Sequence, residues 1–240
     1  MAEGRDFLTH FVLEFIGSLI LGFGLMILRV TTYGYYLLPF FALGAIATCY
    51  RVTGAHLNPA VTLACIFRTD KHAEYNKLLA LMYIVAQYAG FFVAILLGWW
   101  FREEAGTLII DDKPGDDNWW YSEAIGMEFF GSLVLVLIYL NQTSRISWLS
   151  PECGMQAVLI ALSYGALVAW SSKRTGGSLN PAHGFAQNFW DQVDDGDEDA
   201  FKFIWIYTIF PLLGSLVALA VHQFIVLPGH HHANKEVAVA

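Results

Sequence analysis

The sequence predicts an all-α membrane protein with six transmembrane helices plus two re-entrant half-helices, arranged as an inverted repeat. Three observations lead to this fold class: long apolar runs, motifs that occur twice in the same order, and an Asn-Pro-Ala (NPA) motif in each copy. Hydrophobic residues make up 56% of the 240-residue chain and charged residues only 14%, whereas soluble domains carry about 25% charged residues. We therefore expect most of the surface to face lipid.

Six apolar runs are long enough to cross a membrane as helices, which takes roughly 20 mainly apolar residues. Four of the runs contain no Asp, Glu, Lys or Arg, and the other two carry Glu14 and Glu128 inside them. Six helices buried in a soluble protein would leave too little sequence for its surface, which excludes that class. In chain order the runs are 7–28, 30–50, 78–101, 121–140, 153–172 and 203–229.

Three short motifs return later in the chain in the same order. "LEFIGSL" at 13–19 returns as "MEFFGSL" at 127–133, and "GAHLNPA" at 54–60 returns as "GGSLNPA" at 176–182. "QYAGFFVA" has a weaker echo in "PLLGSLVA". Each copy holds three spans, an odd number, so the second copy must enter the membrane with the opposite orientation. This is the inverted-repeat architecture.

We expect the two copies to form one transmembrane domain over 1–240, because neither copy could bury its polar groups alone. The expected boundaries follow from the spans and motifs. Repeat one covers about 7–100, a linker about 101–120, repeat two about 121–227, and a short tail 228–240. Much of the net charge of −8 lies in the linker and in "DQVDDGDED". Lys and Arg are nearly balanced between the two sets of loops, so they decide little about orientation.

The two NPA motifs each predict the start of a short helix. Asn is a good N-cap and Pro is favoured at the first helical position. The apolar stretches that follow are about ten residues long and reach only about half of the ~30 Å hydrocarbon core. Inversion brings their N-termini together, each with about half a positive charge. A wet passage there would pass neutral molecules and repel cations and protons. Its residues are Asn58, Pro59, Ala60, Asn180, Pro181 and Ala182.

The motifs resemble those of the aquaporin (major intrinsic protein) family over about residues 8–227. "GAHLNPAVT" and "LNPA" match the two pore motifs, and "LEFIGS" and "MEFFGS" match the glutamates of the first and fourth helices. The resemblance implies one pore in each subunit of a homotetramer. It also implies that Glu14 and Glu128 support the NPA loops by accepting backbone hydrogen bonds, which we prefer to a proton relay. His56 is expected to pack beside the pore.

The sequence departs from the family at the narrow selectivity filter. The family's usual Arg after the second NPA is replaced by His183, which is shorter and can be neutral. The other filter positions that the resemblance assigns are Val168, Gly177 and one of Leu38 and Phe41.

Three interpretations of this filter stay open. Its small residues make it wider, so that ammonia, urea or glycerol pass with water. Alternatively, bulky neighbours fill it and the pore is narrow or shut. In the third, Lys173 or Arg174, expected in the same re-entrant loop, supplies the missing charge.

The sequence therefore predicts a passive membrane channel for water, with small neutral solutes as further candidates. It predicts no enzyme, no cofactor, no metal site and no nucleic-acid partner. The expected partners are water, small neutral solutes, the lipid bilayer and further copies of the chain. The plasma membrane is the expected location, with an organelle as the alternative and both termini in the cytosol. The alternative function is a poorly conducting structural or adhesive membrane tetramer.

Overall fold

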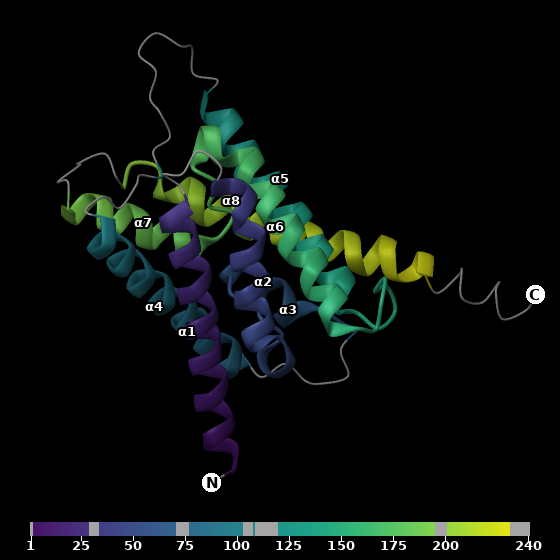
Figure 1. Ribbon diagram of the computed structural model, residues 1–240. Helices are drawn as coiled ribbons and strands as arrows, with labels where there is room; N and C mark the ends of the chain where they lie inside the picture. The colour runs from purple at the N-terminus through teal and green to yellow at the C-terminus, as the bar shows by residue number, and fades with distance from the viewer. Residues whose placement is uncertain are drawn as a thin grey trace, which may run out of the picture.

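The computed structural model describes residues 2–28, 34–70, 77–102, 108, 120–194 and 201–230 (Figure 1). Within these residues every regular element is a helix. Six helices are long and apolar enough to cross a membrane. The predicted all-α membrane fold is thereby confirmed. Most of the expected linker, part of the acidic segment "DQVDDGDED" and most of the expected tail lie outside the described residues.

Two short helices lie among six long helices in the described part of the chain. Each copy of the repeat contributes two long helices, one short helix and a final long helix. In the first copy these are α1 (Ala2–Leu28), α2 (Gly34–Thr53), α3 (Pro59–Phe67) and α4 (Lys77–Arg102). In the second they are α5 (Trp120–Thr143), α6 (Cys153–Thr175), α7 (Pro181–Asp194) and α8 (Ile204–Val221), which continues into the π-helical turn η1 (His222–Val226).

Two helix boundaries beside the NPA motifs differ from the expectation. The short helix α7 has 14 residues rather than about ten, because apolar and polar residues alternate with helical period beyond Phe185. The long helix α6 ends at Thr175, and Gly176 follows it with φ +69° and donates its N–H to Ser172. Lys173 and Arg174 therefore occupy the last helical turn, where their charge suits the helix dipole, and not the re-entrant loop in which they were expected.

The packing of the helices repeats between the two copies. Helix α1 packs on α4 and α2, and α5 packs on α8 and α6 in the same way; Figure 1 shows α1 and α4 side by side. Each short helix packs against the last long helix of the other copy: α3 against α8, and α7 against α4. The two halves are therefore interlocked.

Glycines at matching positions allow the closest helix contacts. A Cβ atom on Gly90 of α4 would lie 2.5 Å from the carbonyl oxygen of Phe15 in α1. A Cβ atom on Gly214 of α8 would meet the carbonyl oxygen of Phe129 in α5. Phe15 and Phe129 occupy the same place in the repeated motifs. Small residues let helix backbones approach closely in lipid, and here they fix the α1–α4 and α5–α8 pairs.

We predict that Gly90→Ala and Gly214→Ala each lower the free energy of unfolding by about 1–3 kcal/mol, as overpacking usually does. A methyl group at either position would force two helix backbones apart. Thermal unfolding of the purified protein in detergent measures this. The matched control is Gly44→Ala in α2, where a Cβ atom would meet nothing within 4 Å. Equal unfolding temperatures for all three variants would contradict the prediction.

Candidate functional site

The two NPA motifs begin α3 and α7 with the same cap. Asn58 has extended backbone (φ −156°, ψ 123°), and its side-chain oxygen accepts a hydrogen bond from Ala60 N at 2.8 Å. The side-chain oxygen of Asn180 accepts from Ala182 N at 3.0 Å. Each asparagine thereby satisfies one of the free N–H groups at a helix start, and its amide nitrogen remains available for another contact.

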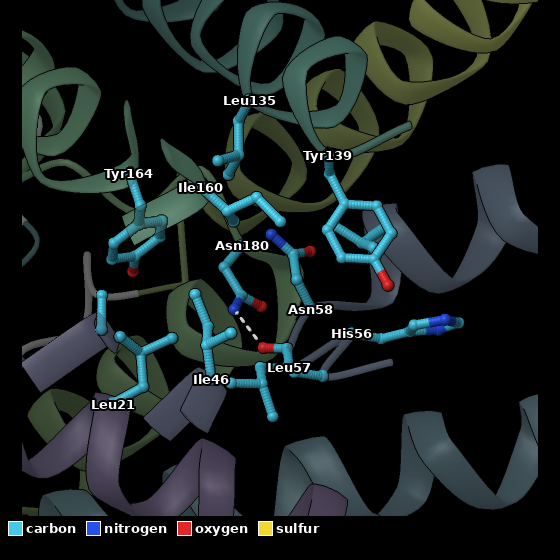
Figure 2. A pocket seen from close by; sticks show the side chains of 13 residues that line it. Leu21, Ile46, His56, Leu57, Asn58, Leu135, Tyr139, Ile160, Tyr164 and Asn180 are labelled. Carbon is cyan, nitrogen blue, oxygen red and sulfur yellow. Dashed lines mark hydrogen bonds between the residues drawn. The ribbon is translucent and has the colours of Figure 1, made fainter. Parts of the chain in front are cut away.

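The two amide nitrogens are used to join the loops to each other. Asn58 Nδ2 donates to the carbonyl oxygen of Leu179 at 2.9 Å, and Asn180 Nδ2 donates to the carbonyl oxygen of Leu57 at 2.9 Å. Figure 2 shows the two asparagine side chains next to each other, with the bond from Asn180 to Leu57 dashed. This crossed pair of hydrogen bonds holds the start of α3 against the start of α7.

The backbone before each motif is strained, and a buried glutamate stabilises it. Leu57 and Leu179 have φ values of +51° and +50°, a region that costs a residue with a side chain about 1–3 kcal/mol. Glu14 accepts from the N–H groups of His56 and Leu57 at 3.0 and 2.8 Å. Glu128 accepts from the N–H of Leu179 at 2.8 Å. Both carboxylates are fully buried.

Glu14 also anchors a short polar network. Gln87 of α4 donates from Nε2 to Glu14 at 2.9 Å and to the Thr62 hydroxyl at 3.0 Å. The Thr62 hydroxyl donates to the carbonyl oxygen of Asn58 at 3.1 Å and lies 3.2 Å from His56 Nδ1. The network ties α1, α3 and α4 to the first loop, and it fixes the orientation of the His56 ring.

A cavity of about 40 Å³ lies where the two motifs meet (Figure 2). A water molecule needs roughly 10–15 Å³ of such volume, so the cavity has room for a short file of waters. Asn58, Asn180 and His56 line it, together with Tyr139 and Tyr164. The rest of the lining is apolar: Leu21, Ala42, Ile46, Ala55, Leu57, Val61, Leu135 and Ile160.

The residues expected to form the selectivity filter do not line this cavity. Leu38, Val168 and His183 are at most 1% exposed. The His183 ring lies 5.5 Å from the ring of Phe91 in α4. Val168 packs closely on Gly177, because a Cβ atom on Gly177 would lie 2.7 Å from the carbonyl oxygen of Val168. Their role in a filter stays a prediction.

Two further filter candidates are placed by their neighbours. The Phe41 ring packs on Gly24 of α1, where a Cβ atom would lie 2.5 Å from Phe41 Cγ. Arg174 Nε forms an ion pair with Glu123 Oε2 at 2.8 Å, and both side chains are about half exposed. Arg174 thus lies on the surface rather than beside His183. The sequence predicted neither contact.

The sequence analysis missed a buried ion pair directly after α3. Arg68 Nε and Nη2 each donate to one carboxylate oxygen of Asp70 at 2.7 Å, and Nη1 donates to the Thr143 hydroxyl at 2.7 Å. Both charged side chains are at most 2% exposed. The pair fastens the end of α3 to the end of α5. An Arg and an Asp two residues apart after a half-helix were the only sequence signal.

The ion pair controls the ionisation of Asp70. Burial alone would raise the pKa of Asp70, but hydrogen bonds from Arg68 and Ser144 and the charge of Arg68 outweigh it and lower the pKa to about 2. A lowered folded-state pKa stabilises the fold above the ordinary value of 3.8, and this stabilisation is lost as the pH falls towards 2.

We predict that acidification from pH 5 to pH 2 removes about 2 kcal/mol of stability through Asp70 alone. The measurement is the unfolding free energy across this range for the wild type and for Asp70→Asn. The variant should be less stable at pH 5, because Arg68 loses its partner, and its stability should fall less on acidification. Parallel pH curves would contradict the assignment.

We predict that Glu14→Ala and Glu128→Ala destabilise the protein by about 1–3 kcal/mol for each loop N–H group left without its acceptor. Both glutamates accept backbone N–H groups of their loops, so the two variants should lose stability to a similar extent. Thermal unfolding in detergent compares them. Glu123→Gln is the control, since the ion pair of Glu123 with Arg174 is about half exposed, and such a pair contributes at most about 1 kcal/mol. Two glutamate variants as stable as this control would contradict the prediction.

Comparison with known proteins places the chain in a family. The family model described as Major intrinsic protein matches residues 1–222. The chain is similar to Aquaporin-1 of Canis lupus familiaris, 32% identical over 191 residues, and to Aquaporin-1 of Homo sapiens, 31% identical over 190 residues. Each alignment covers 78% of this chain and 65% of the relative, so the chain spans about two thirds of the length of these relatives.

A solved structure supports the fold. The X-ray structure of the aquaglyceroporin from Plasmodium falciparum matches with a TM-score of 0.78 at 18% identity, over 94% of this chain and 99% of that one. The family match, the six apolar helices and the fold agree on a multi-pass membrane protein. The chain belongs to the major intrinsic protein family.

Proposed function

We propose that the chain is a passive channel through which water moves down an osmotic gradient. One observation carries the proposal: the crossed hydrogen bonds of Asn58 and Asn180 hold the starts of two half-helices together beside a water-sized cavity. Two relatives named Aquaporin-1 and the membership of the major intrinsic protein family support it.

The lining of the cavity suits small neutral molecules. Each asparagine amide carries two N–H groups, and its crossed bond uses one, so the other is available to a molecule in the cavity. The remaining lining is largely apolar and offers a hydrated ion little to replace its water shell. The two helix starts add about half a positive charge each. Together these features disfavour cations and leave water as the best-suited occupant.

The filter that we propose is narrow. It comprises His183, Val168, Gly177 and Leu38 or Phe41, and burial of three of these side chains favours a tight passage over a wide one. Ammonia, the smallest of the neutral candidates, then ranks above urea, and urea above glycerol. The pair of Arg174 with Glu123 at the surface weighs against Arg174 as a replacement for the missing filter charge.

The assembly that we propose is a homotetramer in the plasma membrane with both termini in the cytosol, made of one domain with one pore in each chain. The proposed partners are water, small neutral solutes and lipid, and the proposed activity is transport, without catalysis or a cofactor. Large apolar side chains such as Phe130, Trp170 and Phe224 are exposed in the single chain, as lipid-facing or subunit-facing surfaces require.

The experiment is stopped-flow light scattering of purified protein in liposomes under an osmotic step. We predict shrinkage several-fold faster than that of bare liposomes, with urea and glycerol entering no faster than through bare lipid. Fast urea entry would favour the wide filter instead. Shrinkage at the rate of bare lipid, with folded tetramers confirmed by size-exclusion chromatography, would contradict the channel and favour the structural or adhesive tetramer.

A further inference from the structure

Two tyrosines enclose the ring of His56 in almost the same way. The ring of Tyr83 in α4 lies 5.1 Å from the His56 ring at 76°, and that of Tyr139 in α5 lies 5.8 Å from it at 87°. Each hydroxyl donates to a backbone carbonyl just before His56. Tyr83 donates to Thr53 at 3.2 Å, and Tyr139 to Gly54 at 2.7 Å.

The two tyrosines differ in their relation to the cavity. Tyr139 and His56 both line it, and Tyr83 is not part of its lining. Figure 2 shows the Tyr139 ring beside the cavity, with its hydroxyl directed towards the loop that carries His56. Tyr139 and His56 are only 2% and 3% exposed. Tyr139 and His56 therefore lie at the part of the cavity that Ala55, His56 and Leu57 line.

The backbone around Tyr139 is held independently of its ring. The Thr143 hydroxyl donates to the Tyr139 carbonyl oxygen at 2.9 Å, and the Arg68 guanidinium donates to Thr143. The buried Arg68–Asp70 pair thus anchors this end of α5. Loss of the bond from the Tyr139 hydroxyl to Gly54 would therefore leave this end of α5 anchored. Gly54 has φ +82°, which favours glycine, and a Cβ there would be in tight contact with that hydroxyl at 3.1 Å.

We propose that Tyr139 is a gate residue, which narrows the part of the cavity lined by residues 55–57 while its hydroxyl is bonded to Gly54 and widens it when the ring turns aside. This rests on the proposed channel function. A hydrogen bond between an uncharged hydroxyl and a carbonyl has a modest net strength, so thermal motion can break the bond from Tyr139 to Gly54.

The test compares osmotic water flux in liposomes holding the wild type, Tyr139→Phe, Tyr139→Leu or Tyr83→Phe. Tyr139→Phe keeps the ring and removes its bond to Gly54, so flux should rise about two- to three-fold. Tyr139→Leu removes the ring, so flux should rise further. Tyr83→Phe removes the matching bond on the other side of His56 and should match the wild type. Size-exclusion chromatography and unfolding temperature show whether each variant is folded, and Tyr139→Phe serves if Tyr139→Leu is not.

The results separate the gate from the channel itself. Folded Tyr139 variants with the water flux of the wild type would overturn the gate. A rise in flux in Tyr83→Phe as large as that in Tyr139→Phe would also overturn it. In both cases, a wild type with faster flux than bare lipid would still support the channel. A wild type at the rate of bare lipid with a fast Tyr139→Leu would support the gate and contradict an open channel at rest. Bare-lipid rates for every folded protein would overturn both.

Discussion

The arrangement of the candidate site depends on the crossed hydrogen bonds between the two NPA loops. Asn58 and Asn180 each use one side-chain oxygen to begin their own helix and one N–H to hold the other loop. Neither bond can form unless both loops reach the same depth. Each half therefore needs the other half to hold its NPA loop in place. The packing of α3 on α8 and of α7 on α4 adds further contacts between the two halves.

Holding non-helical backbone inside an apolar protein requires an acceptor for every N–H group. Glu14 and Glu128 supply that acceptor for the strained residues Leu57 and Leu179. Gly17 and Gly131, from the same two motifs, make room for those leucine side chains, since a Cβ atom on either would lie 2.5 Å from a leucine methyl group. One short motif thus carries both the polar and the steric support of its loop.

The fold and the meeting of the NPA motifs were predictable because they depend on patterns that are local in sequence. Apolar run lengths define the spans, the repeated motifs define the inversion, and Asn-Pro marks a helix start whatever lies around it. The helices agree with the predicted runs to within about five residues at each end, and the extension of α6 to Thr175 includes Lys173 and Arg174 in that helix.

Contacts between distant side chains could not be predicted in this way. The contact of His183 with Phe91, the Arg68–Asp70–Thr143 connection and the bond from Tyr139 to Gly54 join residues whose spacing carries no periodic signal. The sequence identified His183 as unusual, but it could not say which ring would pack against it. The direction of a long side chain is decided by the volume left between helices, which a single sequence does not specify.

The central claim is that two helix starts, held by the crossed asparagine bonds, form a constriction that passes water and excludes ions. The most direct measurement is the proton flux of liposomes whose osmotic water flux is faster than that of bare lipid, with a pH-sensitive dye inside and a pH step applied outside. The account predicts proton entry at the rate of protein-free liposomes. Proton entry that rises in proportion to the amount of protein would contradict it.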